Sequence, residues 1–297
     1  MKKFGIVNRY DLQEEFPILT LRRTYWKTAV DELLWIWQKK SNNIHDLNGH
    51  IWDEWADPDG SIGKAYGYQL SIKHQYPEGE MDQVDRVLYD LKHNPASRRI
   101  LTSLYNHQDL HEMNLYPCAW SMTFNVSGNV LNAILNQRSQ DMLTANGWNV
   151  MQYAVLLHML AQVSGLEAGE LIHVIADAHI YDRHVPVVEE LLFRGFLYNA
   201  LKKILDTVPA HVTTASHRLS VLTAALITSV LFGVYHGNIL QGIYSGLLSL
   251  VMVWLYEITG TLVSNILFHA AFNFSGIATY LICLLYTSPS PRDRQKS

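Results

Sequence analysis

The stretch Asp182-Arg-His-Val-Pro-Val-Val-Glu-Glu-Leu-Leu-Phe-Arg194 decides the architecture of this chain, because two kinds of sequence meet there. Before it, and as far as Arg218, acidic and basic residues are interspersed. From Leu219 to Pro291 the only formal charge is Glu257. Such a contrast within 297 residues indicates two environments. We therefore expect a soluble first part and a membrane-embedded second part over residues 219–285.

Composition narrows the function of the first part. A formal net charge of −4 argues against a nucleic-acid binder with a broad basic face. The two cysteines, Cys118 and Cys283, lie far apart and give no disulfide framework. The first ten residues contain no apolar run of signal-peptide length. These features predict a cytoplasmic location for the first part.

Periodicity in the first part predicts a mixture of helices and strands. Apolar residues at helical spacing predict helices over 24–39, 82–92 and 149–165, the last one closed by a glycine. Alternation of apolar and polar residues around Ser127-Gly128-Asn129 predicts a hairpin over 121–139, and 171–181 has a strand pattern. The predicted class is α+β.

The second part is predicted to be all helical. Apolar runs over 221–235, 239–256 and 262–285 are of roughly membrane-spanning length, although a buried soluble helix remains an alternative for the short first run. A helix with a mixed face is expected over 186–204. The Pro- and Ser-rich tail over 284–297 is predicted to be disordered, and it resembles a translated sequencing-adaptor tail.

Cys118 is the candidate nucleophile of the first part. Arg138 follows twenty residues later, at the end of the predicted hairpin, so the hairpin would bring the two side chains together. A nearby guanidinium lowers a thiol pKa, favours the nucleophilic thiolate and binds anions bidentately. The alternatives are a buried structural cysteine and a surface arginine beside a turn.

Motifs throughout this part resemble the thymidylate synthase family in the order of that family. They are Asp31-Glu-Leu-Leu-Trp35, Ile51-Trp-Asp-Glu-Trp-Ala56, Gly63-Lys-Ala-Tyr-Gly67, Ser97-Arg-Arg-Ile100, Tyr116-Pro-Cys118, Asn136-Gln-Arg-Ser-Gln-Asp141, Asn149-Val150 and Asp177-Ala-His-Ile-Tyr181. The resemblance covers residues 2 to about 190 and implies an α+β thymidylate synthase-like domain, truncated at both ends. The family usually has histidine after the nucleophile, where this chain has Ala119.

The resemblance implies that the chain converts dUMP to dTMP, with 5,10-methylenetetrahydrofolate as co-substrate and no metal. Cys118 would be the nucleophile, Glu32 would organise proton transfers and Tyr66 would help to remove the proton on carbon 5 of the base. The implied substrate-binding residues are Arg98, Arg99, Arg138, Ser139, Asp141, Asn149, His179 and Tyr181. Trp52, Trp55 and Asp141 would line the folate site. Arg98 and Arg99 would cross to the partner site of a homodimer. For the supporting residues the alternatives are a solvated charge at Glu32 and plain core at both tryptophans.

Polar residues in the second part form another constellation. Glu189-Glu190-Leu-Leu-Phe-Arg194 places Glu190 and Arg194 four residues apart, which is also the spacing of an ordinary surface salt bridge. Histidines in apolar segments are functional candidates, and a histidine satisfied by a backbone carbonyl is the alternative. His236, and His269 with Asn273 four residues later, are these candidates.

This constellation resembles the CPBP family of intramembrane proteases, also called CAAX-protease-like, over residues 185–280. The resemblance implies that Glu189 activates a water with the help of His236, and that His269 and Asn273 stabilise the oxyanion or assist a metal. Glu190 and Arg194 would be structural partners. One glutamate and two histidines, Glu189, His236 and His269, would permit zinc.

Both resemblances overlap at the stretch that joins the two parts. We expect a synthase-like domain over 1–188, protease-like helices over 185–283 and an artefactual tail over 284–297. Because the junction has no flexible linker composition, we interpret the chain as a chimera. The leading functional hypothesis is thymidylate synthase, the second is an intramembrane endopeptidase fragment, and the third is an inactive chimeric product.

Overall fold

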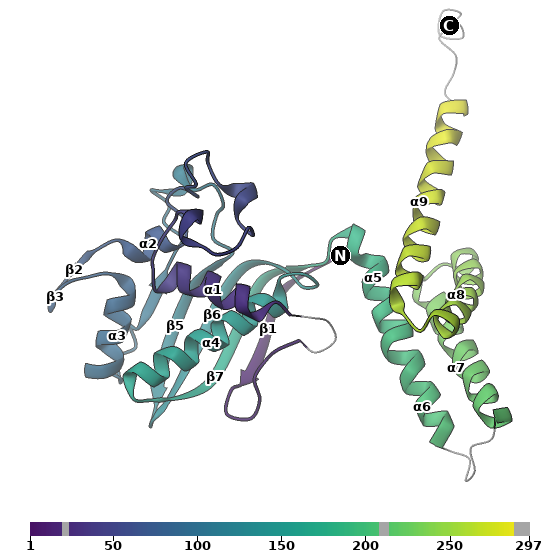
Figure 1. The fold of residues 1–297 in the computed structure, drawn as a ribbon, viewed down its shortest axis with the longest axis horizontal. Coiled ribbons are helices and arrows are strands. Elements are labelled where there is room, and N and C mark those ends of the chain that lie inside the picture. The colour runs from purple at the N-terminus through teal and green to yellow at the C-terminus, as the bar shows by residue number, and fades with distance from the viewer. Residues whose placement is uncertain (20–23, 208–213, 288–297) are drawn as a thin grey trace, which may run out of the picture. The chain divides into compact units, whose positions relative to one another are not determined.

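The computed structural model describes residues 1–19, 24–207 and 214–287 (Figure 1). The chain divides into two compact units, Met1–Tyr181 and a second unit from Asp182 onward. The boundary falls at the first residue of the stretch in which the two kinds of sequence meet.

A five-stranded sheet forms the centre of the first unit. Its strand order is β1-β7-β6-β5-β4, and only the β6–β7 pair is parallel. The strands are β1 (Lys2–Asp11), β4 (Leu101–Ser103), β5 (Ala119–Ser127), β6 (Val130–Asp141) and β7 (Glu167–His179). The predicted hairpin is β5–β6 and the predicted strand is β7, so the α+β class is confirmed. Strand β1 was not predicted, because its partner β7 lies more than 150 residues away in sequence.

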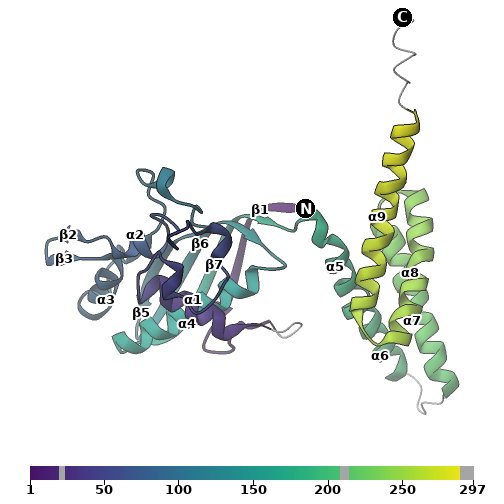
Figure 2. The ribbon, with the colours of Figure 1, turned by 45° about the horizontal axis from the view of Figure 1, so that its top comes forward.

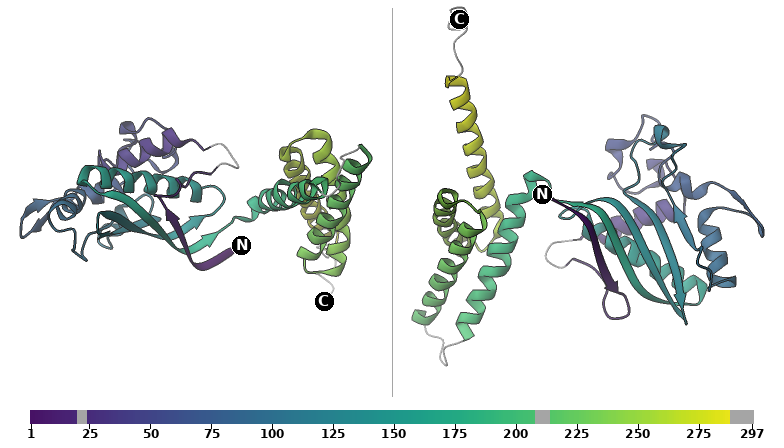
Figure 3. Two further views of the ribbon diagram at one scale, coloured as in Figure 1. Left: turned by 90° about the horizontal axis from the view of Figure 1, so that it is seen from below. Right: turned by 180° about the vertical axis from the view of Figure 1, so that it is seen from behind.

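Helices cover one face of this sheet. They are α1 (Trp26–Trp37), α2 (Gly67–Ser71), α3 (Gln83–His93) and α4 (Asn146–Ser164), with short 3-10 turns η1 (Ile44–Asp46), η2 (Asp53–Trp55) and η3 (Leu110–Glu112) and a small hairpin of β2 (His74–Tyr76) and β3 (Gly79–Met81). Figures 1 and 3 show α1 and α4 on the same face, with the strands uncovered in the view from behind. The core between them includes Leu33, Leu135, Leu157 and Leu171. Helix α4 ends at Gly165 in the left-handed region, as its glycine predicted.

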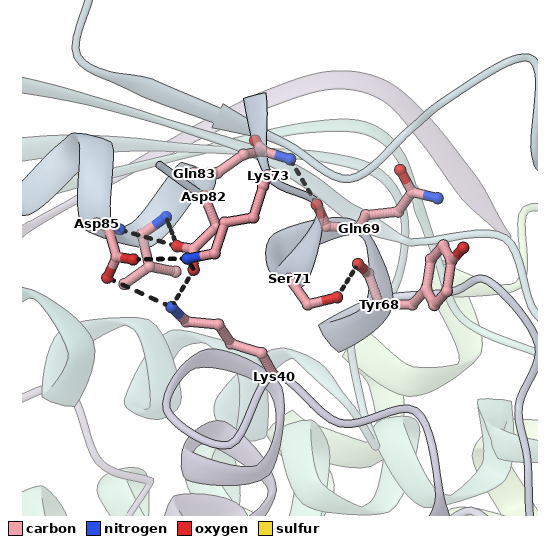
Figure 4. Close-up of polar contacts among 9 residues, drawn as sticks. Lys40, Tyr68, Gln69, Ser71, Lys73, Asp82, Gln83 and Asp85 are labelled. Atoms are coloured by element: carbon pink, nitrogen blue, oxygen red, sulfur yellow. Dashed lines mark hydrogen bonds and ion pairs between the residues drawn. The ribbon is translucent and has the colours of Figure 1, made fainter. Parts of the chain in front are cut away.

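Asp82 anchors helix α3 within this unit. Its carboxylate caps the helix by accepting hydrogen bonds from the backbone N–H groups of Val84 and Asp85. The ammonium groups of Lys40 and Lys73 lie 2.6 and 2.8 Å from the same carboxylate (Figure 4). Burial alone would raise the pKa of Asp82, but the backbone N–H of Asp85 and the two lysines lower that pKa to about 2. The cluster ties the start of α3 to Lys40, just after α1, and to Lys73, between α2 and β2.

The second unit is helical, as predicted. After the turn η4 (Asp182–His184) come α5 (Val185–Glu190), the π-helical segment η5 (Leu191–Tyr198), α6 (Asn199–Thr207), α7 (Thr214–Tyr235), α8 (Ile239–Thr259) and α9 (Leu262–Thr287). The helix predicted over 186–204 is therefore a run of three segments with a wide π-helical middle. Figure 2 shows α8 packed between α7 and α9. At the α7–α8 contact a Cβ on Gly233 would lie 2.5 Å from the carbonyl oxygen of Gly242, so glycine is required there.

The apolar runs of the second unit form α7, α8 and α9. Within the described residues, two helices are long and apolar enough to cross a membrane, His217–Tyr235 and Ile239–Thr259. Three spans were expected, and α9, the third, does not meet this criterion within the described residues. Helix α9 also continues to Thr287, so the first four residues of the tail predicted to be disordered are helical. Residues 288–297 of that tail lie outside the described residues.

Candidate functional sites

The β5–β6 hairpin brings Cys118 and Arg138 together. Cys118 lies immediately before β5, and its carbonyl accepts a hydrogen bond of 2.9 Å from the backbone N–H of Arg138. Arg138 lies within β6 rather than after it, with one guanidinium nitrogen 3.8 Å from the Cys118 Sγ. The guanidinium also donates to the carbonyl oxygens of Tyr116, at 2.7 Å, and Pro117, at 3.0 Å. These bonds hold the arginine beside the thiol, as the hairpin pattern predicted.

The net effect on the thiol differs from the expectation. Burial raises the pKa of Cys118, and the Arg138 guanidinium lowers it by a smaller amount, so the pKa lies above its ordinary value. The arginine thus acts in the predicted direction but does not outweigh desolvation. The Tyr66 hydroxyl accepts a hydrogen bond of 3.1 Å from the Cys118 backbone N–H, which places the predicted proton-removing group beside the nucleophile. Burial raises the pKa of Tyr66 well above its usual range.

Glu32 is a buried carboxylate and not a solvated charge. It is 9% exposed, on α1. The indole N–H of Trp52 donates to Oε1 and that of Trp148 to Oε2, each at 2.6 Å. The side-chain amide of Gln152 donates to Oε2, also at 2.6 Å. Burial raises the pKa of Glu32, while these three donors lower it, and the net shift is upward. A carboxylate with a raised pKa and no cationic partner among its hydrogen-bond donors is suited to proton transfer.

The predicted aromatic residues lie next to this carboxylate. The ring of Trp52 lies 5.6 Å from that of Trp55 and 5.2 Å from that of Tyr66, measured between centroids. Trp52 is buried, whereas Trp55 is 37% exposed. The two tryptophans therefore extend from the core to the surface beside Glu32, which is more than the plain core of the alternative interpretation.

Other predicted nucleotide ligands gather where the parallel strands β6 and β7 end. Ser139 is paired with Asp177 and Asp141 with His179, so their side chains share one edge of the sheet. The rings of His179 and Tyr181 lie 5.0 Å apart. Asp141 accepts hydrogen bonds from the backbone N–H groups of Leu143 and Thr144 and from the Thr144 hydroxyl.

Asn149, another predicted nucleotide ligand, has polar side-chain partners inside the first unit. It lies on α4 and is half-buried. Its Oδ1 is 3.2 Å from the side-chain nitrogen of Gln137, and its Nδ2 is 3.3 Å from the side-chain oxygen of Gln152. It is thus connected to Glu32 through Gln152.

Arg98 and Arg99 are not brought to the thiol. Both are exposed, and they line an open cavity of about 990 Å³ that also contains His74, Arg86 and Tyr105. No other predicted site residue lines this cavity.

The second unit contains a buried charged cluster. A nitrogen of the Arg194 guanidinium lies 3.1 Å from Glu190 Oε1, and both side chains are fully buried, so the pair is not a surface salt bridge. The same guanidinium donates to the Ser249 hydroxyl at 2.6 Å. His269 Nδ1 lies 2.9 Å from Glu190 Oε1, and Asn265 Nδ2 lies 3.4 Å from Glu190 Oε2. Glu190 is therefore the centre of the cluster.

Of the remaining predicted protease residues, only His269 contacts both glutamates. His269 Nε2 lies 3.5 Å from Glu189 Oε2, so His269 bridges the two glutamates. His236 Nδ1 lies 2.8 Å from the Phe232 carbonyl, which is the backbone-satisfied arrangement kept as the alternative. Asn273 is exposed. Within the described part of the chain no three His, Cys, Asp or Glu side chains are grouped to hold a metal, and this includes the candidate zinc set Glu189, His236 and His269.

Sequence reasoning missed the residues that complete both sites. Gln152 and Trp148 hold Glu32 although they lie 120 and 116 residues away from it in sequence. In the second unit, Asn265 and Ser249 were also overlooked. A usable signal existed for Asn265, because it precedes His269 by four residues and therefore shares its helix face.

The first unit is thus an α+β domain in which a cysteine lies beside an arginine, and in which a buried carboxylate and an aromatic cluster are also present. The thymidylate synthase family model matches residues 1–208, more than half of the chain. The chain belongs to the thymidylate synthase family. A second family model, Type II CAAX prenyl endopeptidase Rce1-like, matches residues 183–275, so the two matches overlap at 183–208.

Named relatives agree with the first match. Thymidylate synthase of Bacillus subtilis subsp. natto is 50% identical over 181 residues, which are 60% of this chain and 64% of that protein. The Bacillus licheniformis enzyme is 51% identical over the same shares. The solved structure of thermostable thymidylate synthase A from Bacillus subtilis aligns with a TM-score of 0.61 and 45% identity, over 64% of this chain and 69% of that one. The chain spans about 64% of the length of the curated relatives.

Proposed function

We propose that the first unit catalyses the reductive methylation of dUMP to dTMP. Cys118 adds to carbon 6 of the base, which makes carbon 5 nucleophilic, and its later departure restores the ring. The co-substrate 5,10-methylenetetrahydrofolate supplies the one-carbon group and the hydride. The observation that carries this proposal is the distance of 3.8 Å between the Cys118 Sγ and a guanidinium nitrogen of Arg138. The buried carboxylate of Glu32 in the same unit supports it.

The chain's own residues provide the other functions of such a site. Arg138 and Ser139 bind the phosphate, and His179 and Tyr181 hold the ribose at the same sheet edge. Tyr66 helps to remove the proton on carbon 5. Glu32 exchanges protons with the base. Asn149 reads the base edge, and Trp52, Trp55 and Asp141 line the folate site, where the aromatic rings suit a pterin.

Release of tritium from [5-³H]dUMP in the presence of methylenetetrahydrofolate tests this proposal. The unaltered chain should release tritium, and Cys118→Ser should release at least about a thousandfold less, because the thiolate is the attacking group. Ala119→Ser, next to the nucleophile, serves as a matched control. A folded preparation that releases no more tritium than the Cys118→Ser variant rules the reaction out.

The homodimer is part of this proposal. Among the described residues of the first unit, no helix covers the sheet face away from α1 and α4 (Figure 3). By strand alternation and pairing, apolar residues on this face include Val7, Leu101, Ile134, Ile172 and Val174, none of them fully buried. Burying such a face against a second copy removes apolar surface from water. In that arrangement Arg98 and Arg99, which lie apart from Cys118, contribute to the partner's phosphate site.

Complementation distinguishes a shared site from a self-contained one. An Arg98→Ala/Arg99→Ala variant and a Cys118→Ser variant should each be inactive, and a mixture of the two should recover activity through hybrid dimers with one complete site. If mixing restores nothing although both variants dimerise in sedimentation, the arginines do not act across the interface.

A second candidate function belongs to the second unit. The bridging of Glu189 and Glu190 by His269, in a unit with two membrane-length helices, favours an intramembrane endopeptidase fragment in which Glu189 activates water. In this proposal residues 219–285 embed in a membrane and the synthase-like unit lies in the cytoplasm. Peptidase activity should disappear in Glu189→Ala and His236→Ala and survive in the exposed-site variant Asn238→Ala. Carbonate-resistant recovery with membranes tests insertion, and recovery in the soluble fraction would contradict it.

The third candidate is an inactive chimera. The overlap of the two family matches at 183–208, on a helical run without linker composition, supports a junction between two genes. One long sequencing read across codons 180–200 of the source DNA tests this. An uninterrupted hybrid gene would show that the chimera is encoded as one chain, whereas two separate genes would show that the junction arose when the sequence was assembled.

A further inference from the structure

A line of hydrogen-bonded side chains runs through the first unit from Glu32 on α1 to His173 on β7. Gln152 donates to Glu32 at 2.6 Å and to the Ala29 carbonyl at 2.8 Å. The next contacts are Asn149 to Gln152 at 3.3 Å, Gln137 to Asn149 at 3.2 Å, and His173 to Gln137 at 2.8 Å. His173 is completely buried, and the proposed reaction assigns it no role.

The acceptors at the Glu32 end determine which group donates and which accepts in each of these hydrogen bonds. A carboxylate and a backbone carbonyl only accept, so the Gln152 amide must present its N–H groups to Glu32 and Ala29. Its oxygen must then accept from Asn149 Nδ2. Asn149 Oδ1 must in turn accept from the Gln137 side-chain nitrogen. Each amide has one allowed orientation if every contact is to be a hydrogen bond.

The other end is set by His173. The side-chain nitrogen of Gln137 donates to Asn149 and to Gln140, which leaves the Gln137 oxygen to accept from His173. His173 must therefore carry its proton on Nε2. Its Nδ1 has no hydrogen-bond partner among the described residues. A proton on Nδ1 instead would leave Nε2 as an acceptor and would favour a flipped Gln137. The Gln137 side-chain oxygen would then face the Asn149 oxygen, and that hydrogen bond would be lost.

We propose that His173 is a positioning residue that holds Gln137 as a donor to Asn149, stabilises the Asn149 orientation set from the Glu32 end, and so favours uracil over cytosine. The inference rests on the proposed function, in which Asn149 reads the base. One N–H and one oxygen lone pair of Asn149 remain available to a ligand. Uracil offers an N3–H donor and an O4 acceptor, which match this orientation, whereas cytosine offers the reverse pattern at these two positions.

Two variants of the full chain separate this role from a purely structural one. His173→Leu removes the donor to Gln137, and His173→Gln keeps a side-chain N–H. We expect the ratio of dUMP to dCMP affinity to fall about tenfold in His173→Leu, the effect of one lost hydrogen bond, and to recover within about threefold in His173→Gln. The exposed-histidine variant His158→Leu should leave the ratio unchanged. An unchanged ratio in a folded His173→Leu protein, or equal weakening of both nucleotides, would overturn the proposal.

A measurement without nucleotide distinguishes this proposal from the proposed function. Burial lowers the pKa of His173 to about 4, so the ring stays neutral at pH 7. In NMR of the chain labelled with ¹⁵N in histidine and asparagine, we expect the Nε2–H tautomer of His173. We also expect an Asn149 side-chain amide that exchanges slowly in the unaltered chain and faster in His173→Leu. The Nδ1–H tautomer, or an Asn149 amide insensitive to the variant, would overturn the inference. If the unaltered chain binds neither nucleotide while these signals appear, the proposed function fails and the positioning role stands.

Discussion

Glu32 in the first unit and Glu190 in the second are both buried, and they are stabilised in opposite ways. Glu32 receives only neutral donors, two indoles and one amide. Glu190 faces the Arg194 guanidinium and the His269 ring, and both of its partners are buried with it. Hydrogen bonds alone stabilise the Glu32 carboxylate, whereas a buried guanidinium faces Glu190, and removing one member of such a buried pair is strongly destabilising. In the proposed function Glu32 transfers protons, whereas Glu190 is proposed to stabilise the packing of its unit.

Removing the cation from the second unit should have the largest effect. In Arg194→Ala the fully buried Glu190 loses its counter-charge, and we expect a loss of about 3–5 kcal/mol in the stability of that unit. Thermal unfolding in detergent, followed by circular dichroism, measures it. The double variant Arg194→Met/Glu190→Leu should recover most of the loss, because no unpaired charge remains. Equal instability of the single and double variants would contradict this account.

Replacing Glu32, the proposed proton-transfer group of the first unit, should have the next largest effect. In Glu32→Gln we expect tritium release to fall about 10²- to 10⁴-fold, because the amide neither gives nor takes a proton. Binding of dUMP, measured by calorimetry, should weaken far less. Nearly unchanged tritium release in this variant would show that Glu32 only accepts hydrogen bonds in the folded structure and takes no part in the reaction.

The pH dependence of stability checks the same residue. Because burial raises the pKa of Glu32, the folded chain keeps its proton at pH values where the unfolded chain has lost it. Stability contributed at this site is therefore present at low pH and lost as the pH rises from 4.5 through the folded pKa. The unfolding free energy of the unaltered chain minus that of Glu32→Gln should fall over that window. A difference that rises with pH would contradict the sign.

Asp82 is an intermediate case, a buried carboxylate with two partly exposed lysines. Its lowered pKa means that its contribution is present above about pH 3.8 and lost as the pH falls through about 2. We expect Asp82→Asn to lose about 1–2 kcal/mol at pH 7 and to show less acid sensitivity in chemical denaturation. The exposed neighbour variant Asp85→Asn should lose less. Equal losses in the two variants would assign the effect to net charge and not to the helix cap.

The smallest effect is expected at an exposed pair. Lys64 and Glu112 lie 2.7 Å apart with both side chains partly exposed. Glu112→Gln should change the unfolding free energy by less than about 1 kcal/mol, and by less still in high salt. A larger effect would show that an exposed ion pair can stabilise the chain as much as a buried one, which would contradict the contrast between buried and exposed pairs.

Much of the first unit was predictable from local patterns. The β5–β6 hairpin follows from alternation around Gly128, and it places Arg138 beside Cys118. The balance of charge and burial at the thiol was not predictable, because desolvation depends on how the whole unit packs. Nor was strand β1, whose pairing with β7 joins the two ends of the unit.

In the second unit the order of helices was predictable and the polar contacts were not. The apolar runs mark α7, α8 and α9 because continuous hydrophobicity is a local property. The sequence paired His269 with Asn273, whereas the cluster contains Asn265, one turn earlier on α9. Helical spacing allows both residues on the face of His269, and only packing against α5 selects one of them.

The sequence by itself determined the two kinds of chain, the place where they meet, the family of the first and the closeness of Cys118 to Arg138. These depend on residue types and on spacings within one element or one hairpin. Tertiary structure alone decided that Glu32 is enclosed by Trp52, Trp148 and Gln152, and that Glu190, rather than Glu189, is the centre of its cluster. The physical reason is that burial and hydrogen-bond direction come from residues far apart in sequence. Trp148 and Gln152 lie more than a hundred positions from Glu32, and the Glu190 cluster draws on four different helical segments.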